Sequence, residues 1–305
     1  MKRFFTLLAT ALLAVLPLSA AQTTDLAKTE TKDYQLNGFD GLQVSWVYHV
    51  ELSQAPRHAV RVEAPDFVMP YIRVEVRDGN LILAVEEMPK DIRRRIESGN
   101  RFDVRAYVSM PVLNVLKMSG ASKLTARGEF SSRQNVELSL SGASVARDLS
   151  VKAASIDIEA SGASKIVDLT GKTDKLFLRA SGSAATTMAA DPKTVDLGLS
   201  GAAKLSLKGK LGDVELRASG AVNVEFDGSI EFLDADGSGA SKLSASRAPV
   251  RRARISFSGA SGGMIDVRDE LSVTLSGAAK LNYHPGPALR ITHQSISRGA
   301  TLSSY

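Results

Sequence analysis

The stretch "LSLSGASVARDLS" (Leu138–Ser150) contains the phrase that decides the fold. Its centre, Ser-Gly-Ala, returns along the chain in "EASGASKIVDL", "GLSGAAKLSLKG" and "TLSGAAKLNY". Counting Ser-Gly-Ser as a variant, the copies place their serines at Ser119, Ser141, Ser161, Ser181, Ser200, Ser219, Ser238, Ser258 and Ser276. Successive serines are 18 to 22 residues apart. Such regular spacing predicts an architecture of repeated structural units.

The residues before each of these serines alternate between apolar and polar. In one copy the apolar places hold Val136, Leu138 and Leu140, whereas the places between hold Glu137 and Ser139. This period of two is typical of a strand with one buried face. The fifth place after the serine is again apolar in most copies, which predicts a second short strand beyond the glycine.

Each unit therefore consists of a strand, a glycine corner, a second strand and a variable loop. The chain is predicted to be all-β, a single-stranded parallel β-helix (β-solenoid) with coils of about 20 residues that must stack to bury their inner faces. Glycine is needed where the backbone bends through angles that are costly for other residues. The predicted structural corners are Gly120, Gly142, Gly162, Gly182, Gly201, Gly220, Gly239, Gly259 and Gly277. A leucine-rich repeat fold is not indicated, because the asparagine and leucine ladder of that repeat is missing. A propeller is not indicated either, because the repeat unit is too short for a propeller blade.

Residues 1–21 are predicted to be a signal peptide. Lys2 and Arg3 precede an apolar run that ends near Leu18, and small residues follow at Ser19–Ala21. No lipobox cysteine follows, so we expect a periplasmic or secreted protein with no transmembrane segment in the mature chain. The chain has no cysteine, which excludes disulfides and thiolate metal sites. Its net charge of +5, which falls to +3 without Lys2 and Arg3, is too small to indicate nucleic-acid binding.

The part before the first corner has a different pattern. Residues 22–118 are predicted to form an N-terminal, β-rich set of opening coils and a cap, continuous with an SGA-repeat β-helix over residues 119–305. "VSWVYHVEL" (Val44–Leu52) indicates a strand, and "IRVEVRDGNLILAV" (Ile72–Val85) indicates a hairpin that turns at Asp78-Gly79. A charged insertion follows at Met88–Arg101. A cap protects an open solenoid end from edge-to-edge association, and the solenoid ends could mediate oligomerisation.

Several segments together resemble one bacterial family. They are "FDGLQVSWVYHVELSQA", "VRVEAPDFVMPYIRVEVRDGNLILAV" and "YVSMPVLNVLKMSGASKL", followed by the "SGA" coils. The chain resembles the putative auto-transporter adhesin, head GIN domain family over about Tyr34 to Ser303. The resemblance implies an exported β-helical protein with an adhesive role, and it assigns no catalytic residue. Because the chain stops at Tyr305 without the strands of an outer-membrane barrel, we expect a passenger-like body exported by the general secretory route.

Two columns of charge are expected on the outer surface. Four places before the marked serines stand Glu137, Asp157, Phe177, Asp196, Glu215 and Asp234. The five carboxylates among these six residues would repel one another across adjacent coils. Arg179 and Arg217, with Glu159 and Asp236 in the same register, suggest local pairing. This column is interpreted as a solvated charged ladder, with a weak calcium or cationic-ligand face as the alternative.

The second column lies four places after the marked serine, where lysine occupies every other coil. Its members are Lys123, Lys165, Lys204, Lys242 and Lys280. At two coils per step the ammonium groups would be about 9.6 Å apart, close to the screening length at physiological salt. Well-spaced charge for solubility is one interpretation, and a ligand track for an anionic polysaccharide or an envelope glycolipid is the other.

Catalytic chemistry finds little support in the sequence. The four histidines, His49, His58, His284 and His293, fall at no repeated position and in no nucleophile motif, so no catalytic residue, cofactor or metal site is predicted. The clustered arginines at 93–95 and at 251, 252 and 254 are interpreted as solvated loops. The leading hypothesis is a non-enzymatic envelope or secreted protein that binds a surface polymer or protein. The alternatives are a polysaccharide lyase or hydrolase on a β-helix scaffold and a purely structural spacer.

Overall fold

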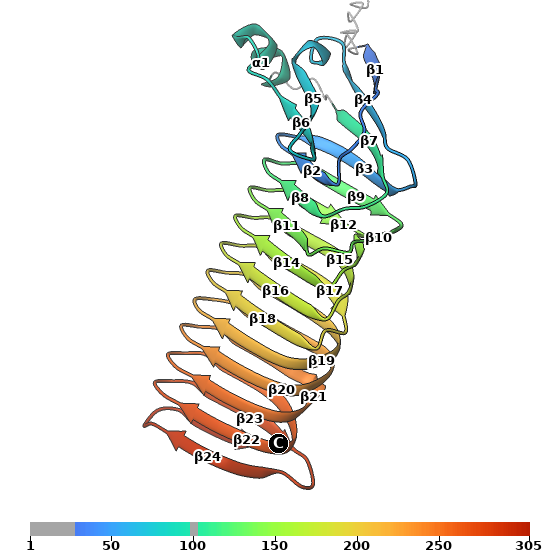
Figure 1. The fold of residues 1–305 in the computed structure, drawn as a ribbon. Coiled ribbons are helices and arrows are strands. Elements are labelled where there is room, and N and C mark those ends of the chain that lie inside the picture. Colours follow the sequence, from blue (N-terminus) through green and yellow to red (C-terminus); the bar gives the residue numbers. More distant parts are fainter. Residues whose placement is uncertain (1–27, 98–102) are drawn as a thin grey trace, which may run out of the picture.

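The Ser-Gly-Ala phrases lie at tight turns between two strands of a parallel β-solenoid (Figure 1). The computed structural model describes residues 28–97 and 103–305. Coils of about 20 residues stack in parallel register, which confirms the predicted fold. The predicted signal peptide, residues 1–21, lies outside the described residues, as do residues 98–101 of the charged insertion.

Each coil has one strand before its corner and one after it. The strands before the corner form a surface that we call the pre-corner face: β2 (Gly41–Val44), β6 (Asn80–Val85), β8 (Val115–Met118), β11 (Val136–Leu140), β14 (Ser155–Ala160), β16 (Lys175–Ala180), β18 (Thr194–Leu199) and β24 (Arg290–Ile296). The strands after it form the post-corner face: β3 (Tyr48–Gln54), β7 (Val104–Met110), β9 (Lys123–Arg127), β12 (Val145–Arg147), β15 (Lys165–Lys172), β17 (Ala185–Ala190), β23 (Lys280–Pro285) and β25 (Thr301–Ser304). Two short strands lie on a third side: β10 (Glu129–Ser131) and β13 (Ser150–Lys152).

The predicted variable loop disappears in four coils. Four long strands instead run from one corner to the next: β19 (Lys204–Ala218), β20 (Asn223–Gly237), β21 (Lys242–Phe257) and β22 (Gly262–Leu275). Two of them bend at stacked glycines, Gly209 and Gly228, whose φ angles are 152° and 121°. A Cβ on Gly228 would lie 2.1 Å from the Gly209 carbonyl oxygen, so only glycine permits this close approach.

The core is a set of apolar columns that run along the solenoid. One column places Leu138, Ile158, Leu178, Leu197 and Leu216 in direct register, and each side chain is at most 2% exposed. Burying each of these side chains contributes about 2 kcal/mol to stability. Because successive coils supply the same position, the core extends with every coil that is added.

The corner itself is fixed by its small residues. All nine predicted corner glycines have φ between 67° and 88°, the left-handed region that favours glycine. In three coils the last serine of Ser-Gly-Ala-Ser is buried and its hydroxyl donates to the carbonyl of the first, as from Ser144 to Ser141 at 2.8 Å. The Ser-Gly-Ala-Ser motif therefore closes its own turn with a hydrogen bond.

The N-terminal end is covered by antiparallel strands. β1 (Thr29–Tyr34) pairs with β4 (Ala59–Pro65), and β4 pairs with β7. After the short 3-10 helix η1 (Met69–Tyr71), β5 (Ile72–Arg77) pairs with β6 in a hairpin that turns at Asp78-Gly79, as the sequence predicted. Figure 1 shows these elements above the stacked coils.

The first coil in the chain is not the first in the stack. β2 pairs with both β6 and β8, and β3 pairs with both β7 and β9. The segment Gly41–Gln54 is therefore enclosed between two coils that come later in the sequence. The predicted strand Val44–Leu52 is in fact broken by a corner at Trp46-Val47, where Trp46 has a φ of 72°.

Candidate functional site

The predicted lysine track forms one column on the post-corner face. Parallel pairing joins Lys123 to Val145, Val145 to Lys165 and Lys165 to Ala185. It continues from Ala185 through Lys204, Asn223, Lys242 and Gly262 to Lys280. All five lysines are exposed, and each is separated from the next by one coil with a short side chain or glycine. The ammonium groups are thus carried two coils apart, at a spacing of about 9.6 Å.

In the described chain the column lysines are among the strand cations that have no carboxylate partner, a group that also includes Arg147, Lys175 and Lys208. Within residues 28–97 and 103–305, none of the five column lysines has a carboxylate within ion-pair distance. By contrast, Lys172 pairs with Glu129 at 2.5 Å and Lys193 pairs with Asp174 at 3.0 Å. The column therefore presents five uncompensated positive charges on one face.

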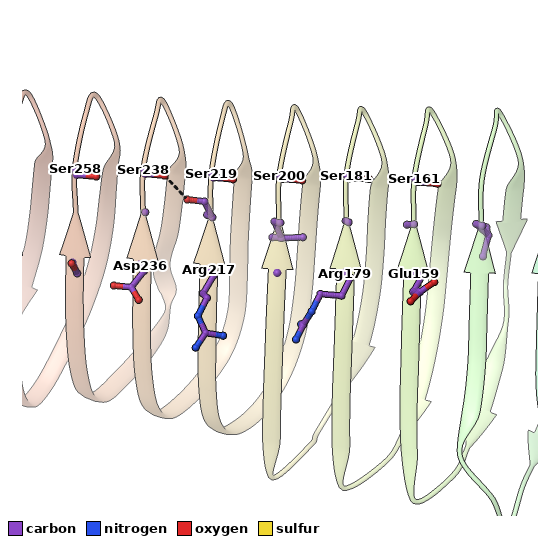
Figure 2. Close-up of a pocket in the computed structure, with 18 of the residues that line it drawn as sticks. Glu159, Ser161, Arg179, Ser181, Ser200, Arg217, Ser219, Asp236, Ser238 and Ser258 are labelled. Carbon is purple, nitrogen blue, oxygen red and sulfur yellow. Dashed lines mark hydrogen bonds between the residues drawn. The ribbon is translucent and has the colours of Figure 1, made fainter.

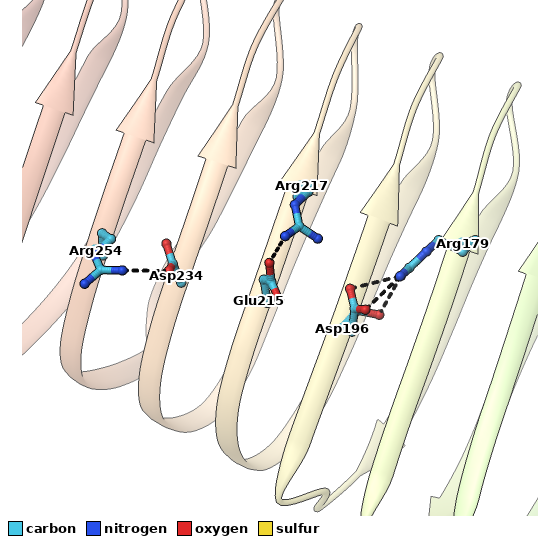
Figure 3. A network of polar contacts seen from close by, with 6 residues as sticks. All are labelled: Arg179, Asp196, Glu215, Arg217, Asp234 and Arg254. Atoms are coloured by element: carbon cyan, nitrogen blue, oxygen red, sulfur yellow. Dashed lines mark hydrogen bonds and ion pairs between the residues drawn. The ribbon is translucent and has the colours of Figure 1, made fainter.

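The acidic column lies on the pre-corner face, and arginines pair with it (Figure 3). Its register runs from Glu137 through Asp157, Phe177, Asp196 and Glu215 to Asp234. Arg179 pairs with Asp196, Arg217 with Glu215 and Arg254 with Asp234. Arg179 and Arg217 do pair with local acids, but the prediction was wrong about the register: their partners lie in the acidic column and not at Glu159 and Asp236. In the described chain, Glu159 and Asp236 form no ion pair.

A glycine makes room for the best of these pairs. Arg179 donates to both carboxylate oxygens of Asp196, at 3.1 and 2.7 Å, and to its backbone carbonyl at 3.1 Å. A Cβ on Gly198, its neighbour in the next coil, would lie 2.8 Å from Arg179 Cδ. The hydrogen bonds and the charge of Asp196 raise the pKa of the Arg179 guanidinium, although partial burial opposes them.

A shallow groove of about 680 Å³ runs beside the corner on the same face (Figure 2). One side carries the side chains two places before each marked serine, and the other carries the serines themselves: Ser161, Ser181, Ser200, Ser219, Ser238 and Ser258. Only Ser238 among these six hydroxyls makes a side-chain hydrogen bond within the described residues, a long contact of 3.5 Å to Ala218. The groove offers a row of hydroxyl groups one coil apart.

The four histidines have different surroundings. His49 on β3 pairs with Asp103 at 2.8 Å, and His284 on β23 lies 3.7 Å from a carboxylate oxygen of Asp266. His58 contacts the Phe39 carbonyl at 2.7 Å, and His293 is exposed on β24. The part of the chain that the structure describes holds no group of three or more metal-ligating side chains.

The arginine clusters are not in loops, contrary to the prediction. Arg93, Arg94 and Arg95 lie in a helix, α1 (Lys90–Glu97). Arg251, Arg252 and Arg254 lie on β21, where neighbouring coils supply carboxylates in register. Arg251, for example, pairs with Glu231 and Asp269, each at 2.8 Å. These strand arginines stabilise the stack by neutralising charge between coils.

Sequence reasoning missed two features of the surface. The corner at Trp46 carries no glycine, so no repeat signal marks it. The second feature is a cleft on the pre-corner face that is lined by Phe177 and Phe232, which belong to two different columns. The sequence signal for this cleft is Phe177 itself, the one residue that interrupts the acidic column.

Comparison with known proteins agrees with this architecture. The family described as "Putative auto-transporter adhesin, head GIN domain" matches residues 38–192 and again residues 186–287. The chain belongs to this family. The two successive matches reflect the repetition of coils within a head GIN domain, and they confirm the resemblance drawn from the sequence. No curated protein matches the chain.

The solved structures that match the chain include two from Parabacteroides species. A putative adhesin from Parabacteroides distasonis ATCC 8503 is 16% identical with a TM-score of 0.52, over 92% of this chain and 98% of that one. A putative adhesin from Parabacteroides merdae ATCC 43184 is 16% identical with a TM-score of 0.48, over 91% and 96% of the two chains. At this identity the first likeness shows a shared fold. Among the described residues of this head GIN domain protein, no helix is long and apolar enough to cross a membrane.

Proposed function

We propose that this protein is an exported, non-enzymatic adhesin that binds an anionic surface polymer along its lysine column. The ligand class is an anionic polysaccharide or the headgroups of an envelope glycolipid. Membership of an adhesin family supports a binding role, and the signal-peptide pattern in the sequence supports export.

The observation that carries the proposal is the alignment of five unpaired lysines. Many arginines elsewhere on the strands are neutralised by carboxylates, as Arg251 is by Glu231 and Asp269. Solubility alone does not require five unpaired lysines to share one column. Five charges spaced by about 9.6 Å span about 38 Å of the solenoid, which suits a linear polyanion better than a small ligand.

A binding measurement with the purified mature chain tests the proposal. The probes are a sulfated glycosaminoglycan, a polyuronate, vesicles that contain an anionic glycolipid, and uncharged dextran. We expect binding to at least one anionic probe at low salt and none to dextran. Changing Lys165, Lys204 and Lys242 to Gln should lower the affinity about tenfold or more by removing counterion release.

The matched control removes cations that already have partners. The double variant Lys172→Gln, Lys193→Gln should bind as the parent does, because these lysines are paired with Glu129 and Asp174. Equal binding by the parent and the triple column variant would refute the track. Cleavage of a bound polysaccharide would refute a purely adhesive role.

A further inference from the structure

The pre-corner face holds a second feature that could bind a ligand, a cleft of about 300 Å³ between two phenylalanines. It spans four consecutive coils, on β16, β18, β19 and β20. One column runs from Phe177 through Asp196 and Glu215 to Asp234. The adjacent column runs from Lys175 through Thr194 and Asp213 to Phe232. The two rings thus stand at diagonally opposite corners of the patch.

Both rings are available at the surface. Phe177 is 36% exposed, one of the few large apolar side chains outside the core in the described chain, and Phe232 is half-buried. The guanidinium of Arg252 lies 5.5 Å from the Phe232 centroid, a contact that holds this ring in place. Three coil steps separate the rings by about 14 Å along the axis.

The space between the rings is polar, yet its charges nearly cancel. Four carboxylates face it, those of Asp196, Asp213, Glu215 and Asp234. Arg179, Arg217 and Arg254 pair with three of them (Figure 3). Lys175 at one edge and Arg252 beside Phe232 bring the positive charges to five, against four negative ones. A strongly charged ligand therefore gains little net attraction here.

The paired groups are suited to hydrogen bonding with an uncharged partner. Asp196 is held by two side-chain hydrogen bonds from Arg179, so its orientation is fixed before a ligand arrives. Carboxylates accept and guanidinium groups donate in known directions. Apolar ring faces flanking a few fixed polar groups are typical of small-molecule and sugar-sized sites.

We infer that the Phe177–Phe232 cleft binds a neutral glycan segment, with sugar rings stacked on the two phenyl groups and hydroxyls bonded to the arginine–carboxylate pairs between them. A sugar ring presents apolar C–H groups on its face and hydroxyls at its edge, which matches this arrangement. The cleft lies on the pre-corner face and the lysine column on the post-corner face. The inference is thus independent of the proposed anion binding.

Calorimetry on the full mature chain tests the inference, with neutral linear hexasaccharides of glucose, mannose, galactose and N-acetylglucosamine as probes. At high salt, where the lysine column contributes least, at least one probe should bind. Phe177→Ala should weaken its binding about tenfold, equivalent to about 1.4 kcal/mol. Phe177→Tyr should restore most of the affinity, because the stacking surface returns.

The control is Met264→Ala, which removes another exposed apolar side chain, on the post-corner portion of β22. This variant should bind as the parent does, and all variants should melt at nearly the parent temperature because the changed side chains are at the surface. Failure of every neutral hexasaccharide to bind would overturn the inference, as would binding that Phe177→Ala leaves unchanged. Preferential binding of an acidic or basic peptide at this cleft would overturn it in favour of a protein partner. Loss of anionic-polymer binding in the lysine variants is a separate outcome that bears only on the proposed function.

Discussion

Gly201 lies against Gly182 of the preceding coil so closely that a Cβ on Gly201 would stand 2.7 Å from the Gly182 carbonyl oxygen. The same contact recurs at Gly220, where a Cβ would stand 2.6 Å from the Gly201 carbonyl oxygen. Each carbonyl also accepts the next coil's backbone N–H, as the Gly182 carbonyl accepts from Ala202 at 2.7 Å. The oxygen therefore cannot move away without losing a bond of the stack.

The first prediction concerns these corners. Gly201→Val and Gly220→Val should each lower the free energy of unfolding by about 3 kcal/mol or more, because a β-branched residue is strained at positive φ and also meets the neighbouring backbone. Denaturant unfolding measures the change. Gly198→Val is the control: it meets only the flexible Arg179 side chain and should cost much less. A similar loss at all three positions would show that the corner geometry is not the cause.

The second prediction concerns the ion pair of Arg179 and Asp196, whose side chains are 48% and 29% exposed. A double-mutant cycle with Arg179→Gln and Asp196→Asn should give a coupling of about 0.5–1 kcal/mol that falls with added salt. The more exposed pair of Lys193 and Asp174 serves as the control and should couple by less than about 0.3 kcal/mol. Equal coupling in both pairs would mean that the two-pronged geometry contributes nothing.

The third prediction uses the gaps in the lysine column. Placing lysine at Ala185 and Asn223 fills two of the uncharged coils between Lys165 and Lys242. The affinity for an anionic polymer should then depend more steeply on salt, by analogy with counterion release from nucleic acids. Affinity titrations at several salt concentrations measure the slope. As a control, lysine is placed instead at Thr194 and Ser256, on the pre-corner face. If the lysine column is the binding face, this variant should show the same salt dependence of affinity as the parent.

The fourth prediction concerns alkaline pH. Tyr48 is fully buried and its hydroxyl donates to the Ala84 carbonyl at 3.1 Å. Burial, with a smaller effect of Tyr34, raises the pKa of Tyr48 above its ordinary value of 10.0. The folded protein thus holds this proton more tightly than the unfolded chain does. Its contribution to stability should be complete below about pH 10 and should fall as the pH rises further.

Denaturant unfolding of the parent and of Tyr48→Phe across this pH range provides the measurement. At neutral pH the variant should be less stable by about 1 kcal/mol, from the lost hydrogen bond. The difference should shrink or reverse above about pH 10, because phenylalanine has no proton to lose. A constant difference at every pH would show that Tyr48 does not ionise on unfolding.

The repeat made most of the solenoid predictable. A repeated glycine indicates a positive backbone angle, and the alternation of apolar and polar residues around it indicates which side chains are buried. The corners at Gly142 and Gly162 and the stacked column of Lys165 and Lys204 therefore follow from the spacing alone. Register is fixed because a slip by one residue would turn Leu178 and Leu197 outward. Because successive coils have nearly the same length, residues at the same position of neighbouring coils lie side by side in the structure.

The remaining features depend on contacts that no local pattern encodes. Trp46 adopts positive φ because the stack around it, including the bond from Ala121 N–H to its carbonyl at 2.7 Å, determines the turn. The reach of Arg179 to Asp196 depends on the absence of a side chain at Gly198 in the next coil. The enclosure of Gly41–Gln54 depends on the parallel pairing of β6 with β2 and of β7 with β3, and this long-range pairing is not visible in any periodicity.

That enclosure has a consequence for how the chain folds. The segment Gly41–Gln54 acquires its neighbours only when β6, β7, β8 and β9 have been made, so we expect these strands to assemble with it as one nucleus of high contact order. Beyond Arg127 each new coil needs only the coil already formed, and growth becomes a sequence of local additions. We therefore expect the slow step of folding to lie in this N-terminal part of the solenoid. The number of coils behind it can change in evolution without changing the slow step.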